Sequence, residues 1–440
     1  MLGPLSSYLG IVTEYFDISI VVILSPILSA VFLPKTMSPE IAAAAIIAGF
    51  ALSYMTRPIG ASIWGHYSDR IGRRNMMILS MGIVAVATAA VATLPSYAEA
   101  GYMGYACYMI LRGVVGVAYG GDITAGWAFA IEWAPKRWRG LVGGFIIAGA
   151  GSGSFLVSSV SGIFLAHWGN AAMMAYAWRY VFLSALIPFV AVLITRVAIT
   201  ESPLFQSIKL AGKVEKSPLK TLASKGTRRR FLQSTMVALG IGISQTPVSA
   251  YFATMLTNAP SVLTVGQELT AYQLFAIGVI VGMLLGGGIS QFIGRRRLLL
   301  IVLSLSAVLV VPLLFGMVNF ATVSNLTVVY SLGFVLGALL CLSWGALPAY
   351  INERFGTGHR ASGVGLSYAI GSSLISGLVL LSVPAIHSLF IPIESKSFWF
   401  TVGLISIIGC IIAIAAVYKG PETAQLDLEK IENPQASTAN

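Results

Sequence analysis

Charged residues are scarce in this 440-residue sequence. Only 10% of the residues are Asp, Glu, Lys or Arg, whereas about 25% would be charged in an average soluble domain. In contrast, 57% of the residues are hydrophobic and the mean hydropathy is +0.85. A single globular core cannot hide this much apolar surface from water. The shortage of charge therefore excludes an ordinary soluble protein and indicates that lipid surrounds most of the chain.

Cysteine and histidine are also rare, with three and four copies. Cys107, Cys341 and Cys410 all lie in apolar runs, and none has metal-ligand spacing with another cysteine or a histidine. We interpret them as small core residues. The sequence also lacks a nucleophile–base constellation and a phosphate-binding loop, so we expect no enzyme, no metal site and no cofactor.

Long apolar runs are abundant. A membrane-spanning helix needs about 20 mostly apolar residues. Twelve such runs lie at about 8–33, 40–64, 75–95, 102–130, 140–167, 178–199, 231–257, 269–293, 298–318, 326–350, 362–388 and 397–418. The first run has neither a basic region before it nor a small-residue cleavage site, so we expect a retained helix and not a signal peptide. These runs predict an all-α integral membrane protein with twelve transmembrane helices.

Basic residues are distributed unevenly between the connections. Most of the 27 Lys and Arg residues fall on one side of the predicted bundle, and the connections on the other side contain only Lys35 and Lys396. The positive-inside rule then places both termini in the cytoplasm. Topology alone explains the net charge of +11, and no nucleic-acid partner is needed. We therefore expect a multi-pass protein of the cell membrane.

The longest connection divides the apolar runs into two groups of six. It carries eight basic residues, which we expect to lie on anionic lipid headgroups. The predicted organisation is an N-terminal six-helix half at 1–200, a basic cytoplasmic linker at 201–230, a C-terminal six-helix half at 231–419 and a polar, loosely held cytoplasmic tail at 420–440.

Two motifs repeat between these halves. The IGRR stretch around Gly72 recurs around Gly294, at an offset of 222, and the stretch 132–139 recurs as 353–360, at an offset of 221. Two independent matches with nearly the same offset indicate an internal duplication. Two six-helix halves related by an axis along the membrane normal are typical of transporters with a central binding site.

Several stretches resemble the major facilitator superfamily. GHYSDRIGRR at 65–74 is similar to the signature between its second and third helices. Stretches similar to its metabolite:proton symporter branch include EYFD at 14–17, RPIG at 57–60 and RGVVGVAYGGD at 112–122. GPET at 420–423 also resembles sugar porters. The resemblance implies the major facilitator fold and a monomeric secondary transporter in the lipid bilayer, driven by the proton motive force.

Charged residues inside the predicted spans are candidates for proton coupling, because a charge in hydrocarbon costs at least about 2.5–3.5 kcal/mol. The candidates, all in the first half, are Asp17, Arg112, Glu14 and Asp122. A rise of about 1.5 Å per residue puts Asp17 and Arg112 roughly 15 Å deep, near the bilayer middle. The resemblance implies that the first and fourth helices line the same cavity, so we expect these two side chains to interact, although purely structural roles are open for both. Arg57 is expected near the cytoplasmic edge, where snorkelling is an equal alternative.

Substrate is expected between the halves. The predicted substrate ligands are Asp17, Arg112, Gln245, Tyr251, Trp344 and Tyr368. Arg112 offers a cation to a carboxylate, so the leading hypothesis is symport of H⁺ with a small organic acid or zwitterion by alternating access. Sugar:proton symport, with Gln245 and aromatic residues facing hydroxyl groups, is the alternative. Drug or metabolite efflux by antiport and a non-transporting receptor are weaker alternatives.

The resemblance also implies a conformational gate. Its predicted residues are Gly65, Asp69, Arg70, Gly72, Arg73, Arg74, Glu132, Arg139, Glu353 and Arg360. Asp69 is expected to hold the positive N-terminal end of the eleventh helix, near Ala361, across the two halves. Because Gln291 stands at the position of Asp69 in the second copy, we expect a latch on one side only.

Overall fold

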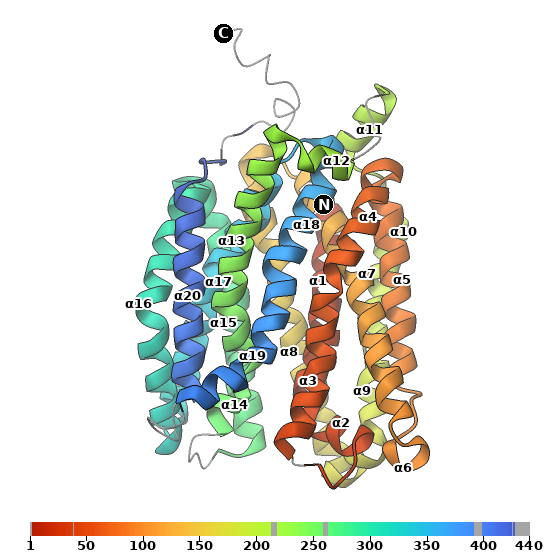
Figure 1. Ribbon diagram of the computed structural model, residues 1–440, viewed down its shortest axis with the longest axis vertical. Coiled ribbons are helices and arrows are strands. Elements are labelled where there is room, and N and C mark those ends of the chain that lie inside the picture. Colours follow the sequence, from red (N-terminus) through yellow and green to blue (C-terminus); the bar gives the residue numbers. More distant parts are fainter. Residues whose placement is uncertain are drawn as a thin grey trace.

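A computed structural model describes residues 2–37, 39–212, 218–257, 263–390, 398–424 and 426. The basic residues Lys213, Lys216, Lys396 and Lys430 and the tail 427–440 lie outside the described residues. The described parts of the chain form helices and contain no β-strand, and most helices run side by side along one direction (Figure 1). The expected all-α architecture is therefore confirmed.

The first half begins with a helix that is interrupted near its end. Its helices are α1 (Leu2–Ile23), α2 (Ser25–Phe32), α3 (Pro39–Met55), α4 (Arg57–Ile71), α5 (Arg73–Val91), α6 (Tyr97–Ala100), α7 (Met103–Trp133), α8 (Arg139–Ala172), α9 (Trp178–Ser184) and α10 (Leu186–Ala198). The linker contains α11 (Pro203–Leu210) and α12 (Pro218–Ala223).

The second half also begins with an interrupted helix, α13 followed by α14. Its helices are α13 (Lys225–Ala250), α14 (Phe252–Thr257), α15 (Val265–Ile293), α16 (Arg295–Thr322), α17 (Leu326–Asn352), α18 (Arg360–Tyr368), α19 (Ile375–Phe390) and α20 (Phe398–Tyr418). A π-helical segment at Ala369–Leu374 joins α18 to α19. The basic run before residue 231 forms the first turns of α13, so this helix begins earlier than its apolar run.

Ten helices in the described part of the chain are long and apolar enough to cross a membrane. The predicted runs 40–64 and 231–257 are not among these ten. Both are nevertheless helical, the first as α3 and α4 and the second as α13 and α14.

The two halves meet along several helix pairs. Helices α4 and α7 of the first half contact α18, α8 contacts α15 and α17, and α3 contacts α19. The N-terminus, α11 and α12 all lie at one end of the bundle, which we call the linker end (Figure 1). The repeated motifs are therefore brought to the same end of the molecule.

Buried arginines distinguish this core from a purely apolar one. Arginines among the largest fully buried side chains of the described residues are Arg57, Arg73, Arg112, Arg196, Arg295 and Arg360. Each contacts a carboxylate within 3.3 Å. A buried charge is tolerated when it is paired, so these contacts mark where the fold holds its polar chemistry.

Candidate functional site

The predicted contact between Asp17 and Arg112 is confirmed. Helices α1 and α7 bring the two side chains together in a bidentate pair, with N–O distances of 2.9 and 3.0 Å. Thr88 of α5 donates a third hydrogen bond to the Asp17 carboxylate at 2.8 Å. Both charged side chains are buried. A planar guanidinium matches a carboxylate in this fork geometry, which makes the pair strong and specifically oriented.

Glu14 and Arg57 form a second buried pair, with 2.7 Å between Arg57 Nη2 and Glu14 Oε1. The alternative that Arg57 snorkels to the membrane edge is wrong, because its exposure is 0%. The break between α3 and α4 at Thr56 starts a new helix at Arg57, and the guanidinium lies 4.2 Å from the Tyr54 ring centroid. Beyond this ion pair, no hydrogen-bond partner among the described residues reaches the second Glu14 oxygen or the Nε and Nη1 atoms of Arg57.

Asp122 belongs to a third pair. Its carboxylate lies 2.5 Å from Arg196 of α10, which also donates to the Met77 carbonyl at 2.6 Å. Gly10 of α1 packs against both charged groups. Asp122 therefore joins three helices of the first half. A gating or relay role for it stays a prediction.

A cavity of about 60 Å³ lies between the halves and has room for a few water-sized molecules. Helix α1 contributes Tyr15 and Ser19 and α3 contributes Tyr54. The second half contributes Gln245 and Tyr272, among others. Gln245 donates a short hydrogen bond to Ser249, which also lines the cavity. The cavity therefore combines aromatic faces with a few polar groups, as small-molecule sites do.

The other predicted substrate ligands lie outside the cavity lining in this conformation. Asp17 and Arg112 face into the first half, and the Tyr251 hydroxyl donates to the Leu380 carbonyl at 2.7 Å. Substrate contacts by these residues stay predictions.

Trp344 and Tyr368 belong to an aromatic cluster that joins the halves. The Tyr368 ring lies 6.0 Å from Trp344 and 5.0 Å from Trp127 of α7. This cluster packs the second half against the first, and a role for Trp344 or Tyr368 in substrate binding also stays a prediction.

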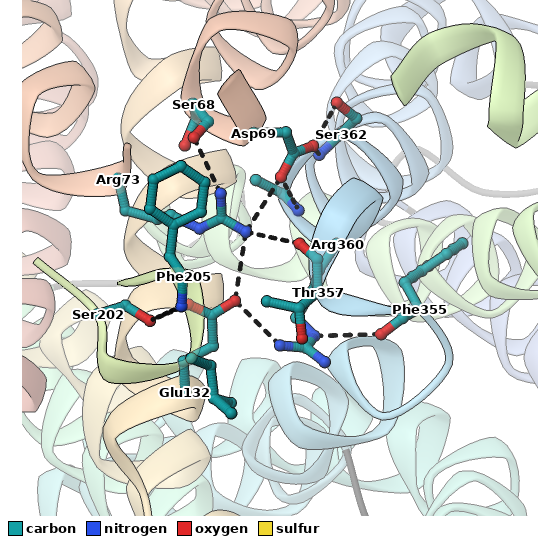
Figure 2. Close-up of polar contacts among 12 residues, drawn as sticks. Ser68, Asp69, Arg73, Glu132, Ser202, Phe205, Phe355, Thr357, Arg360 and Ser362 are labelled. Carbon is teal, nitrogen blue, oxygen red and sulfur yellow. Dashed lines mark hydrogen bonds and ion pairs between the residues drawn. The ribbon is translucent and has the colours of Figure 1, made fainter. Parts of the chain in front are cut away.

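At the linker end, Asp69 lies beyond the apolar run 40–64 and contacts the first turn of α18 (Figure 2). The backbone N–H groups of Ala361 and Ser362 donate to it at 3.2 and 2.8 Å, and the Ser362 hydroxyl donates at 2.7 Å. Burial raises the pKa of Asp69, Arg73 and these donors oppose the rise, and the resulting pKa is about 6. The carboxylate therefore stays mostly ionised at pH 7 and accepts hydrogen bonds at the positive end of α18.

Beside this contact between Asp69 and α18, which we call the latch, Glu132 makes a second connection between the halves (Figure 2). Its carboxylate lies 2.9 Å from Arg360 and 3.3 Å from Arg73, and the Ser202 hydroxyl donates a short bond to it. Arg73 also donates to the Thr357 carbonyl at 2.8 Å. These contacts hold α5, α7 and the start of α18 together, so the two halves are closed at the linker end.

The expectation of a one-sided latch is wrong. Gln291 Oε1 accepts a hydrogen bond from the backbone N–H of Gly140 at 3.0 Å and another from Arg295 at 2.9 Å. Gly140 lies in the first turn of α8, the position that Ala361 occupies in α18. An amide oxygen can accept the same backbone bond as a carboxylate, so the second copy keeps a latch that carries no charge.

The second copy also repeats the supporting contacts. Arg295 lies 3.2 Å from Glu353, and Thr423 donates to Glu353 at 2.7 Å. Burial raises the pKa of Glu353, and Arg295 opposes this shift. Thr423 is fully buried, which contradicts the expectation that the tail is loosely held from residue 420 onward. The start of the tail is instead the second copy of the segment that begins the linker.

Gly72 and Gly294 show why the tail start is fixed. Both have positive φ, 127° and 100°, where side chains other than glycine are strained. A Cβ at either position would collide with a carboxylate, Glu201 for Gly72 and Glu422 for Gly294. Glu201 accepts a bond from the backbone N–H of Arg74, and Glu422 accepts from Arg295 and Arg296. Neither acid was among the residues predicted from the sequence, although the two are separated by the same offset of 221 as the repeated motifs.

The remaining gate candidates have separate contacts. Gly65 packs against Ser362, which requires a small residue because a Cβ would lie 3.1 Å from the Ser362 Cα atom. Arg70 is exposed and lies 3.2 Å from His66. Arg74 donates to carbonyls at the end of α10, and Arg139 donates to the Leu426 carbonyl at 2.9 Å. Within the described residues, no cluster of His, Cys, Asp and Glu has the form of a metal site.

Comparison with known proteins identifies the fold. The family model of the Major Facilitator Superfamily matches residues 8–377. The chain belongs to this superfamily. It is 28% identical to the Inner membrane metabolite transport protein YhjE of Escherichia coli, over 84% of both chains. It is 27% identical to the Proline/betaine transporter of the same species, over 84% of this chain and 74% of the relative.

A solved structure has the same architecture. The proton:xylose symporter XylE bound to 6-bromo-6-deoxy-D-glucose superposes with a TM-score of 0.78 at 18% identity, over 98% of both chains. These matches confirm the resemblance to the metabolite transporters of the superfamily. The protein is a multi-pass membrane transporter and not an enzyme.

Proposed function

We propose that the protein is a proton-coupled symporter for a small zwitterion or organic acid and works by alternating access. In this proposal it is a monomer of the cell membrane with twelve spanning helices and both termini in the cytoplasm. The proton motive force drives transport, without a cofactor. The observation that carries the proposal is the presence of two buried arginine–carboxylate pairs, Asp17–Arg112 and Glu14–Arg57, in the first half.

Charge balance supports coupling between proton and substrate. Each pair is buried and neutral as a whole. A proton on Asp17 alone would leave Arg112 as an uncompensated buried cation, and breaking a buried pair costs about 3–5 kcal/mol. An organic acid arriving alone would instead add an uncompensated negative charge, whereas a zwitterion has no net charge. For an organic acid, the proton and the substrate together keep the buried charges balanced, so each increases the affinity for the other.

The substrate site is assigned to Glu14 and Arg57. Tyr54, whose ring contacts Arg57, and Tyr15, the neighbour of Glu14, both line the cavity. Outside their mutual contact, Glu14 Oε2 and the Nε and Nη1 atoms of Arg57 have no hydrogen-bond partner in the described residues, so a ligand can satisfy them. A substrate carboxylate would bind Arg57 and a positively charged nitrogen would bind Glu14. Tyrosine faces also suit a methylated ammonium group.

Two relatives support a zwitterion by name, since they are described as an Ectoine/proline transporter and a Proline/betaine transporter. Sugar:proton symport is the alternative, and the polar cavity groups Gln245, Thr246 and Ser249 favour it as partners for hydroxyl groups.

Uptake into proteoliposomes tests the proposal. Radiolabelled proline, glycine betaine and xylose would each be offered with and without an imposed pH gradient. We expect a zwitterion to accumulate only with the gradient and to be released by a protonophore. If xylose accumulates and neither zwitterions nor carboxylates inhibit its uptake, this assignment would be overturned in favour of the sugar alternative.

Asp17→Asn tests the proton site. This variant should lose pH-driven accumulation and keep substrate exchange, because the uncharged amide cannot take up and release a proton. Thr88→Val is the control, since it removes one hydrogen bond from Asp17 but leaves the titratable group. Unchanged pH-driven accumulation in Asp17→Asn would remove Asp17 from the mechanism.

A further inference from the structure

A groove of about 720 Å³ runs between α13 and α20 at the linker end. The groove is basic at the linker end and apolar further along the two helices. Basic lining residues are Lys225, Arg228, Arg229 and Lys419, and apolar lining residues are Leu232, Met236, Ile411, Ile412, Ala415 and Ala416. Neither the transport site nor the latch uses these side chains.

Helical spacing explains this gradient. Lys225, Arg229, Leu232 and Met236 are separated by three or four residues, so they form one stripe along α13. Ile411 and Ala415 are likewise four apart on α20, and Lys419 follows the helix end at the same spacing. Both walls therefore change from charged to apolar in the same direction.

The positive charge of the groove is not neutralised by the described residues. No acidic side chain lines the groove in the described part of the chain, and its four basic residues form no salt bridge there. Nearby, burial lowers the pKa of Arg354, Tyr350 opposes this shift, and Arg230 and Arg229 lower the pKa further. The arginines at the start of α13 thus repel a neighbouring cation, and an anion in the groove would relieve that repulsion.

The apolar part of the groove determines the kind of anion. Leu232, Met236 and Ile411 are 49%, 44% and 57% exposed. A soluble phosphate would match the basic end and leave these side chains uncovered. An acyl chain would cover them, and basic pockets between membrane helices suit anionic headgroups.

We propose that this groove binds one anionic phospholipid. Its phosphate lies between Arg228, Arg229 and Lys419, and one acyl chain follows Leu232 and Met236 along α13. The inference rests on the membrane embedding of the chain and does not depend on the substrate or on proton coupling. Helix α13 also carries the cavity residue Gln245. The lipid would therefore hold the linker end of a helix that lines the transport cavity.

Native mass spectrometry of the purified full-length protein tests the site, with added phosphatidylglycerol or phosphatidylcholine as probes. We expect one phosphatidylglycerol to bind in preference to phosphatidylcholine. The triple variant Arg228→Gln, Arg229→Gln, Lys419→Gln should bind it at least roughly tenfold more weakly. The control variant Lys136→Gln, Lys209→Gln, Lys220→Gln removes the same charge from exposed positions outside the groove and should retain binding.

Filling the groove separates lipid binding from general attraction to charge. Ala415→Trp should weaken phosphatidylglycerol binding without changing the net charge, and it remains informative if the triple variant fails to fold. Millimolar inorganic phosphate should not displace the lipid. Equal phosphatidylglycerol binding by the groove and control variants, equal binding of phosphatidylcholine, or displacement by phosphate would each overturn the proposal.

Discussion

Replacing Asp69 by Asn should open the linker end. The carboxylate accepts three hydrogen bonds from Ala361 and Ser362, at 2.7 to 3.2 Å, and lies 3.1 Å from Arg73. Asparagine keeps one acceptor oxygen, turns an NH₂ group toward donors and removes the charge. A hydrogen bond to a charged group contributes about 1.5–3 kcal/mol and a neutral one about 0.5–1.5. We therefore expect the closed state to lose about 2–3 kcal/mol, a shift of roughly 30- to 150-fold.

The second latch provides the opposite change. Gln291→Glu has nearly the same shape and places a negative charge beside the N–H of Gly140 and the guanidinium of Arg295. Charge at a helix N-terminus is worth about 0.3–1 kcal/mol, so the closed state should gain a few-fold in population.

Distances between spin labels on α4 and α18 would report the population of each state in these two variants. A closed population in Asp69→Asn that matches the unmodified protein would refute the reasoning, as would an opening caused by Gln291→Glu.

Further variants test the Glu14–Arg57 pair and the start of the tail. Glu14→Gln should destabilise the fold by about 3–5 kcal/mol because it leaves Arg57 uncompensated, and adding Arg57→Gln should restore part of the loss in thermal unfolding. If the double variant is no more stable than Glu14→Gln, the two side chains do not compensate each other's charge. Thr423→Val should cost about 1.5–3 kcal/mol because it removes a hydrogen bond to the charged carboxylate of Glu353. The loss would be measured as a lower unfolding temperature, and an unchanged temperature would contradict it. Ending the chain after residue 420 should also lower the unfolding temperature, because it removes the contacts of Glu422 and Thr423.

The membrane fold followed from the sequence because apolar length gives the spans. Depth along a helix gives the level of Asp17 and Arg112, and the family resemblance, which implies that their helices line one cavity, was needed to predict that they pair. The repeated motifs placed Asp69 and its counterpart at one end of the bundle. None of these inferences needed the direction of a side chain.

The sequence was less informative where a contact depends on the direction in which a side chain points. Arg57 is buried because its guanidinium pairs with Glu14 and packs on the Tyr54 ring, and its position along the apolar run does not reveal this direction. Tyr251 donates to a carbonyl of α19 in this conformation, a direction that spacing alone cannot reveal, and its role as a substrate ligand stays a prediction. The absence of charge on Gln291 predicted that the second copy has no latch. This prediction is wrong, because the amide oxygen of Gln291 accepts the equivalent backbone hydrogen bond. The paired acids Glu201 and Glu422 were detectable, since they obey the offset already found.

Proton movement driven by substrate is the most direct test of the proposed mechanism. Proteoliposomes containing a pH-sensitive dye and no initial pH gradient would receive external proline or glycine betaine. The proposal predicts internal acidification that follows substrate entry, and its loss in Asp17→Asn. Substrate entry without any change in internal pH, or entry that requires sodium instead, would contradict proton coupling through Asp17.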